Sequence, residues 1–201
     1  DVFVYLDDVQ YIKREWKNRN RIRKQPTSKE IKWISVSVEK DACNKKINQV
    51  KIFDKNNWRD DHINSIKDSY GFSPRFNEYS EDIFAIIKDE NINRLSDLNI
   101  KLIQKACDFF KIKSDFVFSS EFGFKEKREY KLLEICKKLD CNIFLANNKT
   151  CDYADKNIFL EANIKLIPQN FNQKIYQQKH KGLNLDWLPY LSWIDYIFNK
   201  K

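Results

Sequence analysis

The alternation of apolar and polar positions along the chain predicts an α/β fold. Short apolar runs rich in β-branched and aromatic residues predict strands at residues 1–6, 31–38, 47–53, 115–118, 141–146 and 164–168. Apolar residues at helical spacing predict helices at residues 58–70, 73–87, 95–110 and 125–139, with a short helical turn at residues 157–162. Because helices and strands alternate in the second half, we expect a mainly parallel sheet covered on both faces.

The first apolar run ends at two neighbouring carboxylates, Asp7 and Asp8, and a dense polar loop follows it. The amides and cations of this loop are Gln10, Lys13, Arg14, Asn18, Arg19 and Asn20. In open α/β sheets, ligands bind outside the carboxyl ends of strands. Guanidinium and amide groups suit phosphate or carboxylate, and aspartates suit hydroxyls, an amine or a metal. The alternative is a strand edge that leads into a solvated basic loop.

Two further places carry candidate chemistry. His62 could act as a proton shuttle near neutral pH, but it lies on the apolar stripe of a predicted helix, so a packed histidine is the favoured alternative. The strand at residues 115–118 ends at Ser119, Ser120 and Glu121, which could contact a phosphate or a sugar. Serine is equally common where any strand passes into a loop.

Composition narrows the function classes. The 201 residues carry a net charge of +8, from 37 basic and 29 acidic side chains, which suits an anionic ligand or nucleic acid. The cations are spread out, and their densest cluster is at residues 13–24; a generally basic surface is the alternative. Five cysteines without a C-x-x-C pair predict neither a zinc site nor a disulfide framework. We find no P-loop, dinucleotide-binding glycine pattern or G-x-S-x-G elbow.

The compartment that we expect follows from two sequence features that we do not find. The chain has no signal-peptide pattern and no apolar run long enough to span a bilayer, so we expect a cytoplasmic protein.

The opening run D-V-F-V-Y-L-D-D-V-Q-Y, followed by K-R-E-W-K-N-R-N-R-I, resembles the signature of the WbqC-like protein family. Asp152 and Tyr153 match a D/E-Y-L element of that family, although Ala146 and Asn147 stand where the family has Ser-Gly. The ending L-P-Y-L-S-W-I-D-Y-I-F-N is similar to the family's F-x-P-Y-L-S-x-x-D-x-L-F-N. The family's opening Q-P-x-x-x-P-W-x-G-Y has no counterpart and the chain has no Met, so we expect that an N-terminal strand and loop are absent from it.

The resemblance implies a single domain over residues 1–201 with a three-layer Rossmann-like fold, for which a nucleotidyltransferase-like arrangement is one option. Members of the family are encoded in clusters for bacterial O-antigen and other surface polysaccharides. Some nucleotidyltransferase-like enzymes activate a carboxylate with ATP and form an amide. The implied function is therefore N-acyl or N-aminoacyl transfer to a nucleotide-linked amino sugar, with ATP or an activated acyl donor as co-substrate and no metal site.

In that interpretation Asp7 or Asp8 would hold or deprotonate the amine. Lys13, Arg14 and Arg19 would hold phosphate or stabilise negative charge in the transition state. The remaining substrate contacts would come from Gln10, Asn18, Asn20, Ser119, Ser120, Glu121, Asp152 and Tyr153. Two other classes stay open: a non-catalytic accessory protein that binds a sugar nucleotide, and a nucleic-acid-binding protein.

Overall fold

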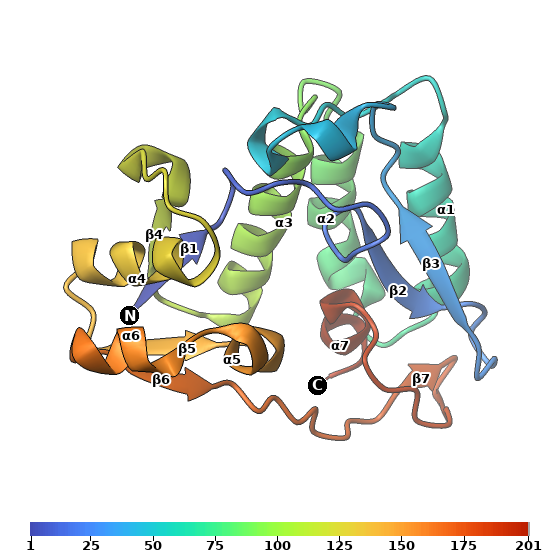
Figure 1. The fold of residues 1–201 in the computed structure, drawn as a ribbon. Helices are drawn as coiled ribbons and strands as arrows, with labels where there is room; N and C mark the ends of the chain where they lie inside the picture. Colours follow the sequence, from blue (N-terminus) through green and yellow to red (C-terminus); the bar gives the residue numbers. More distant parts are fainter. Residues whose placement is uncertain (201) are drawn as a thin grey trace. The chain divides into compact units, whose positions relative to one another are not determined.

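The structure is a computed structural model that describes residues 1–200, which divide into two compact units (Figure 1). Asp1–Leu6 and Asp115–Asn172 form the first unit. Asp7–Ser114 and the segment that starts at Gln173 form the second. Both units are therefore discontinuous in sequence.

The first unit contains two pairs of parallel strands. Strand β1 (Val2–Tyr5) pairs with β4 (Asp115–Phe118), and β5 (Ile143–Ala146) pairs with β6 (Lys165–Pro168). The helical elements of this unit are η3 (Ser119–Phe122), α4 (Arg128–Lys138), α5 (Asn148–Tyr153) and α6 (Lys156–Glu161). Its small core consists of Leu133, Cys136, Ala154, Phe159 and Ile164.

The second unit is built on helices. Strand β2 (Arg19–Arg23) pairs with β3 (Ile31–Ser35) in an antiparallel hairpin, which packs on α1. Its helices are α1 (Trp58–Tyr70), α2 (Phe76–Lys88), α3 (Leu95–Phe110) and α7 (Trp193–Asn199), and α2 packs against the other three. Its short elements are η1 (Ala42–Asn44), η2 (Ile47–Gln49), β7 (Lys179–His180) and β8 (Leu183–Asn184).

The core of the second unit follows from the helical spacing of its apolar residues. Ile66 on α1, Ile83 on α2 and Leu98 on α3 are almost fully buried, together with Ile22 of β2 and Phe198 of α7. Residues three or four apart share one helix face, so each helix buries a continuous apolar stripe. Phe198 closes this core, because its ring lies 5.2 Å from the ring of Phe76.

The structure confirms a mixed α/β chain with parallel strand pairs, and it confirms the long helices. Among residues 1–200 each sheet has only two strands, and the three-layer Rossmann-like arrangement stays a prediction. The predicted strand at residues 47–53 is wrong in its first half. There the Gln49 side chain accepts a hydrogen bond from the Lys46 backbone N–H and closes η2. The sequence analysis also missed α5, which the Asn147 side chain caps through the Thr150 N–H.

Within the described residues, none of the helices has the length and apolar character needed to cross a membrane.

Candidate functional site

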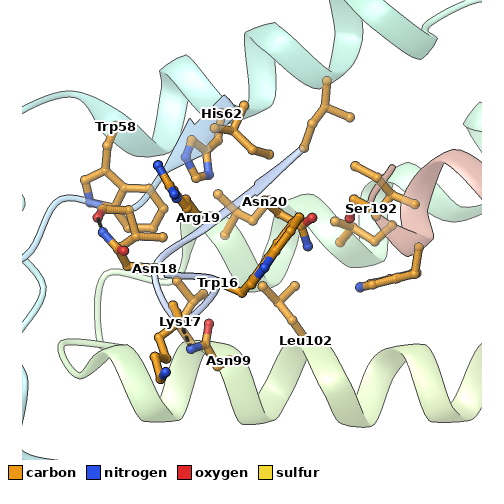
Figure 2. A pocket seen from close by; sticks show the side chains of 18 residues that line it. Trp16, Lys17, Asn18, Arg19, Asn20, Trp58, His62, Asn99, Leu102 and Ser192 are labelled. Atoms are coloured by element: carbon orange, nitrogen blue, oxygen red, sulfur yellow. Dashed lines mark hydrogen bonds between the residues drawn. The ribbon is translucent and has the colours of Figure 1, made fainter. Parts of the chain in front are cut away.

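A pocket of about 120 Å³ lies inside the second unit (Figure 2). Its base is apolar and is made by core residues of α1, α2, α3 and the β2–β3 hairpin. The apolar side chains that line it are Ile34, Val36, Ile66, Ile83, Ile87, Leu98, Leu102 and Ile194. The other lining residues, which include all its polar side chains, are Trp16, Lys17, Asn18, Arg19, Asn20, Trp58, His62, Asn99, Ser192 and Trp193. An apolar base with a few convergent polar groups is the usual composition of a small-molecule site.

Hydrogen bonds hold the segment that leads into β2 against this pocket. The Asn99 side chain donates from Nδ2 to the Lys17 carbonyl at 2.7 Å. Asn18 donates from its own Nδ2 to the Val36 carbonyl at 3.0 Å, and the Val36 N–H donates to the Asn18 carbonyl. These bonds fix which way the Asn18 amide points. Its Oδ1 is left buried without a hydrogen-bond partner and can accept one from a ligand.

His62 lies on α1, one turn after Trp58, and the centres of the two rings are 5.1 Å apart. Burial lowers the pKa of His62 to about 4, although a hydrogen bond to the Ser35 carbonyl and the charge of Asp61 act in the opposite direction. The imidazole is therefore neutral near pH 7. Its Nε2 is buried and has no hydrogen-bond partner. Because the other ring nitrogen donates its proton in a hydrogen bond to the Ser35 carbonyl, Nε2 is the basic nitrogen.

Arg19 supplies the third polar group. Its guanidinium stacks at 4.2 Å from the centre of the Trp33 ring, and its Nη2 donates to the Arg14 carbonyl. The Arg19 Nε is buried and has no partner. Buried polar atoms are nearly always hydrogen-bonded. A hydrogen-bond acceptor on Asn18, a charged donor on Arg19 and a basic nitrogen on His62 are all unpartnered and belong to residues that line one pocket, which indicates a polar ligand.

Four of the predicted site residues line this pocket: Asn18, Arg19, Asn20 and His62. The favoured sequence interpretation of His62, a packed histidine, describes its burial but not its unpartnered nitrogen. The Asn20 Oδ1 accepts from the backbone N–H of Arg21 at 2.8 Å, so its oxygen is already engaged.

The other predicted residues of the opening loop lie in the same unit but do not line the pocket. Asp7 and Asp8 are buried, and Asp7 accepts hydrogen bonds from the side chain and the backbone N–H of Asn48 at 3.1 and 2.8 Å. Gln10 donates to the Cys43 carbonyl. Lys13 and Arg14 are exposed. Asp7 thus anchors the start of the loop to η2.

The remaining predicted residues belong to the first unit. Ser119, Ser120 and Glu121 form the start of η3 directly after β4, and Ser119 is fully buried. Asp152 and Tyr153 are exposed on α5, which follows β5. Binding by these residues stays a prediction. Asn147 does not adopt the left-handed conformation that would replace the family's glycine, because its φ is −67° and it caps α5.

The WbqC-like protein family matches residues 1–201. This chain belongs to the WbqC-like protein family. The uncharacterised protein Rv1507c of Mycobacterium tuberculosis is 27% identical over 201 residues, which cover 99% of this chain and 84% of that protein. No solved structure is significantly similar to this chain. The resemblance seen in the opening segment is therefore confirmed over the whole WbqC-like chain.

Several residues that line the pocket of this WbqC-like protein were not predicted from the sequence. Trp16, Trp58, Asn99 and Trp193 all contribute to it. Asn99 carried a usable signal, because it is a lone amide next to Leu98 on the apolar face of α3. The structure brings no three His, Cys, Asp or Glu side chains together as a metal site anywhere in residues 1–200.

The neutral state of His62 predicts a pH dependence of stability. In the unfolded WbqC-like chain His62 takes up a proton near pH 6.5, whereas in the folded chain it does so only near pH 4. The unfolded state thus binds more protons between these values, so stability falls as the pH drops through this window. The loss should reach roughly 3 kcal/mol. Urea unfolding at pH 4.5 and pH 7 measures it. The difference should shrink in H62Q; equal differences in the two proteins would contradict the prediction.

Proposed function

We propose that this chain transfers an acyl or aminoacyl group to the amine of a nucleotide-linked amino sugar in bacterial surface-polysaccharide (O-antigen) synthesis. The observation that carries the proposal is the pocket in which Asn18 Oδ1, Arg19 Nε and His62 Nε2 are buried without partners. An acceptor, a cationic donor and a neutral base can each assist amide formation, by orienting the amine, stabilising the developing oxyanion and taking up the proton. The pathway itself is supported by the family, whose members are encoded in such gene clusters.

Each group would have one task in the reaction. The amine nitrogen attacks the acyl carbonyl carbon of a thioester or an acyl adenylate, the C–N bond forms, and the bond to the leaving thiolate or AMP breaks. His62 Nε2 would take the proton that the amine loses. An anionic acyl donor bound beside the imidazole would raise the pKa of His62 from about 4 towards neutrality, as the charge of Asp61 already does in part.

The other two groups would orient and stabilise the reacting atoms. Arg19 would donate from Nε to the carbonyl oxygen as negative charge develops on it. Asn18 would accept a hydrogen bond from the amine and so aim its lone pair. A dry cavity of about 150 Å³ holds benzene, so the apolar base of this smaller pocket would fit an acyl group of roughly six carbons or fewer. The catalytic assignment of Asp7 and Asp8 stays a competing prediction.

A direct assay tests this function. The protein is incubated with UDP- or dTDP-linked amino sugars and either short acyl-CoA esters or carboxylates with ATP, and amide products are identified by mass spectrometry. We expect an amide product with one donor class. Binding of a nucleotide sugar without any product from both donor classes would instead support a non-catalytic accessory role.

A further inference from the structure

The outward face of the β2–β3 hairpin carries two arginines and two tryptophans. We call Trp16, Arg19, Arg21 and Trp33 the tryptophan–arginine face. Strand pairing places Arg21 directly opposite Trp33, and Arg19 is two residues earlier on the same side of the strand. The guanidinium of Arg21 lies 4.9 Å from the ring centre of Trp16 and 5.7 Å from that of Trp33. The two indole rings are 5.1 Å apart, so the four side chains form one cluster.

The positive charges of this face are not balanced. Among residues 1–200, neither Arg19 nor Arg21 forms an ion pair with a carboxylate. The Nε of each is buried and has no hydrogen-bond partner. Partly buried cations are normally paired. Stacking on the indole rings holds both guanidinium groups in place, so both are already ordered to bind an anion, and Arg21 can do so bidentately.

The rings themselves are accessible. Trp16 is 58% exposed and Trp33 is 38% exposed, which is unusual for the largest apolar side chains. Exposed aromatic rings beside cations are the surface on which nucleobases stack next to their phosphates. Arg19 also lines the pocket, so an anion on this face would lie beside the pocket.

We propose that the tryptophan–arginine face binds a nucleoside diphosphate. Arg19 and Arg21 bind the two phosphates, and the base stacks on Trp16. The group attached to the second phosphate then reaches the edge of the pocket at Asn18, and the apolar base of the pocket stays open for the acyl group. This assignment rests on the proposed function in one respect: that function makes the attached group an amino sugar. Binding of the diphosphate itself does not depend on the reaction.

Titration of the protein with UDP and with dTDP tests the proposal, with tryptophan fluorescence and calorimetry as readouts. Arg21→Gln should weaken binding at least about ten-fold, because a charge-assisted bidentate contact is lost. Lys24→Gln is the matched control: it removes one positive charge three residues further along the chain, from an exposed side chain that pairs with Glu30. It should change affinity less than about two-fold. Thermal unfolding establishes that both variants are folded.

The base contact has its own readout. Trp16→Leu should weaken UDP binding several-fold while binding of inorganic pyrophosphate stays the same. Three results would each overturn the proposal: the protein binds neither UDP nor dTDP, R21Q and K24Q lose the same amount of UDP affinity, or the wild type binds pyrophosphate as tightly as UDP. A single-stranded oligonucleotide that displaces UDP and binds more tightly, with a steep dependence on salt, would overturn it in favour of a nucleic-acid site.

The outcomes separate this inference from the proposed function. UDP binding that needs Arg21, in a protein that forms no amide, would leave the nucleotide site standing and reject acyl transfer. If wild type and R21Q form the amide at the same rate and with the same KM, acyl transfer stands and the nucleotide site at Arg21 is rejected.

Discussion

Replacing His62 with glutamine should lower the rate of amide formation by at least about 100-fold, the usual contribution of a positioned general base. Glutamine keeps an amide that can donate to the Ser35 carbonyl, but it has no basic nitrogen at the position of the free Nε2. The loss should fall on kcat, with KM for the nucleotide sugar nearly unchanged. Initial rates over a range of substrate concentrations give both constants.

The chain supplies its own control for this substitution, because it has only one other histidine. His180 lies on β7, outside the pocket, and His180→Gln should leave the rate unchanged. Asp7→Asn and Asp8→Asn test the competing assignment. A rate that falls in D7N or D8N but not in H62Q would move the catalytic base to the start of the opening loop and contradict the role of His62.

Arg23→Met should reduce the free energy of unfolding of the second unit by about 3–5 kcal/mol, the typical effect of breaking a buried charged network. Arg23 is 1% exposed. It donates to the carbonyls of Ser28 and Asp186 and, at 2.5 Å, to Gln178 Oε1. Gln178 in turn donates to the buried carboxylate of Asp195 at 2.9 Å. Methionine would leave the two carbonyls unpaired and remove the positive charge that offsets the burial of Asp195.

Tryptophan fluorescence during urea unfolding is a suitable measurement, since all five tryptophans belong to the second unit. Lys24→Met is the matched control. Its exposed ion pair with Glu30 contributes little, so it should change stability by less than about 0.5 kcal/mol. A loss below about 1 kcal/mol in R23M would mean that the network around Asp195 is not needed for stability.

Elements with strong periodicity could be predicted from sequence. Helices α1 and α3 begin and end where their apolar stripes do, and the strands at residues 115–118 and 143–146 follow from short apolar runs. The sequence could not show which strands pair with each other. Nothing local predicts that β1 pairs with β4, more than 100 residues later, or that β2–β3 forms an antiparallel hairpin apart from the parallel pairs.

The site could be predicted only in part, because its residues come from segments that are far apart in the sequence. Asn18, Arg19 and Asn20 stood out because they are dense polar residues in one loop. His62 and Asn99 meet them only because α1 and α3 pack near the hairpin. Asp195 shows the opposite case. It is a polar residue within the apolar C-terminal run, a position that does not distinguish a site residue from a structural one, and the structure places it in a hydrogen bond with Tyr176 at 2.5 Å.

The order in which the second unit is synthesised affects how it folds. The ribosome makes its first segment, up to Ser114, then the whole stretch Asp115–Asn172 of the first unit, and only afterwards Gln178 and Phe198. At about 5–20 residues per second, the core around Ile22 and Leu98 stays uncovered for roughly 4–17 seconds, the time needed to synthesise the chain from Asp115 to Phe198. During those seconds the nascent chain exposes apolar surface that chaperones or proteases can bind. Synthesis of the chain is therefore a stage at which quality control can act on this protein.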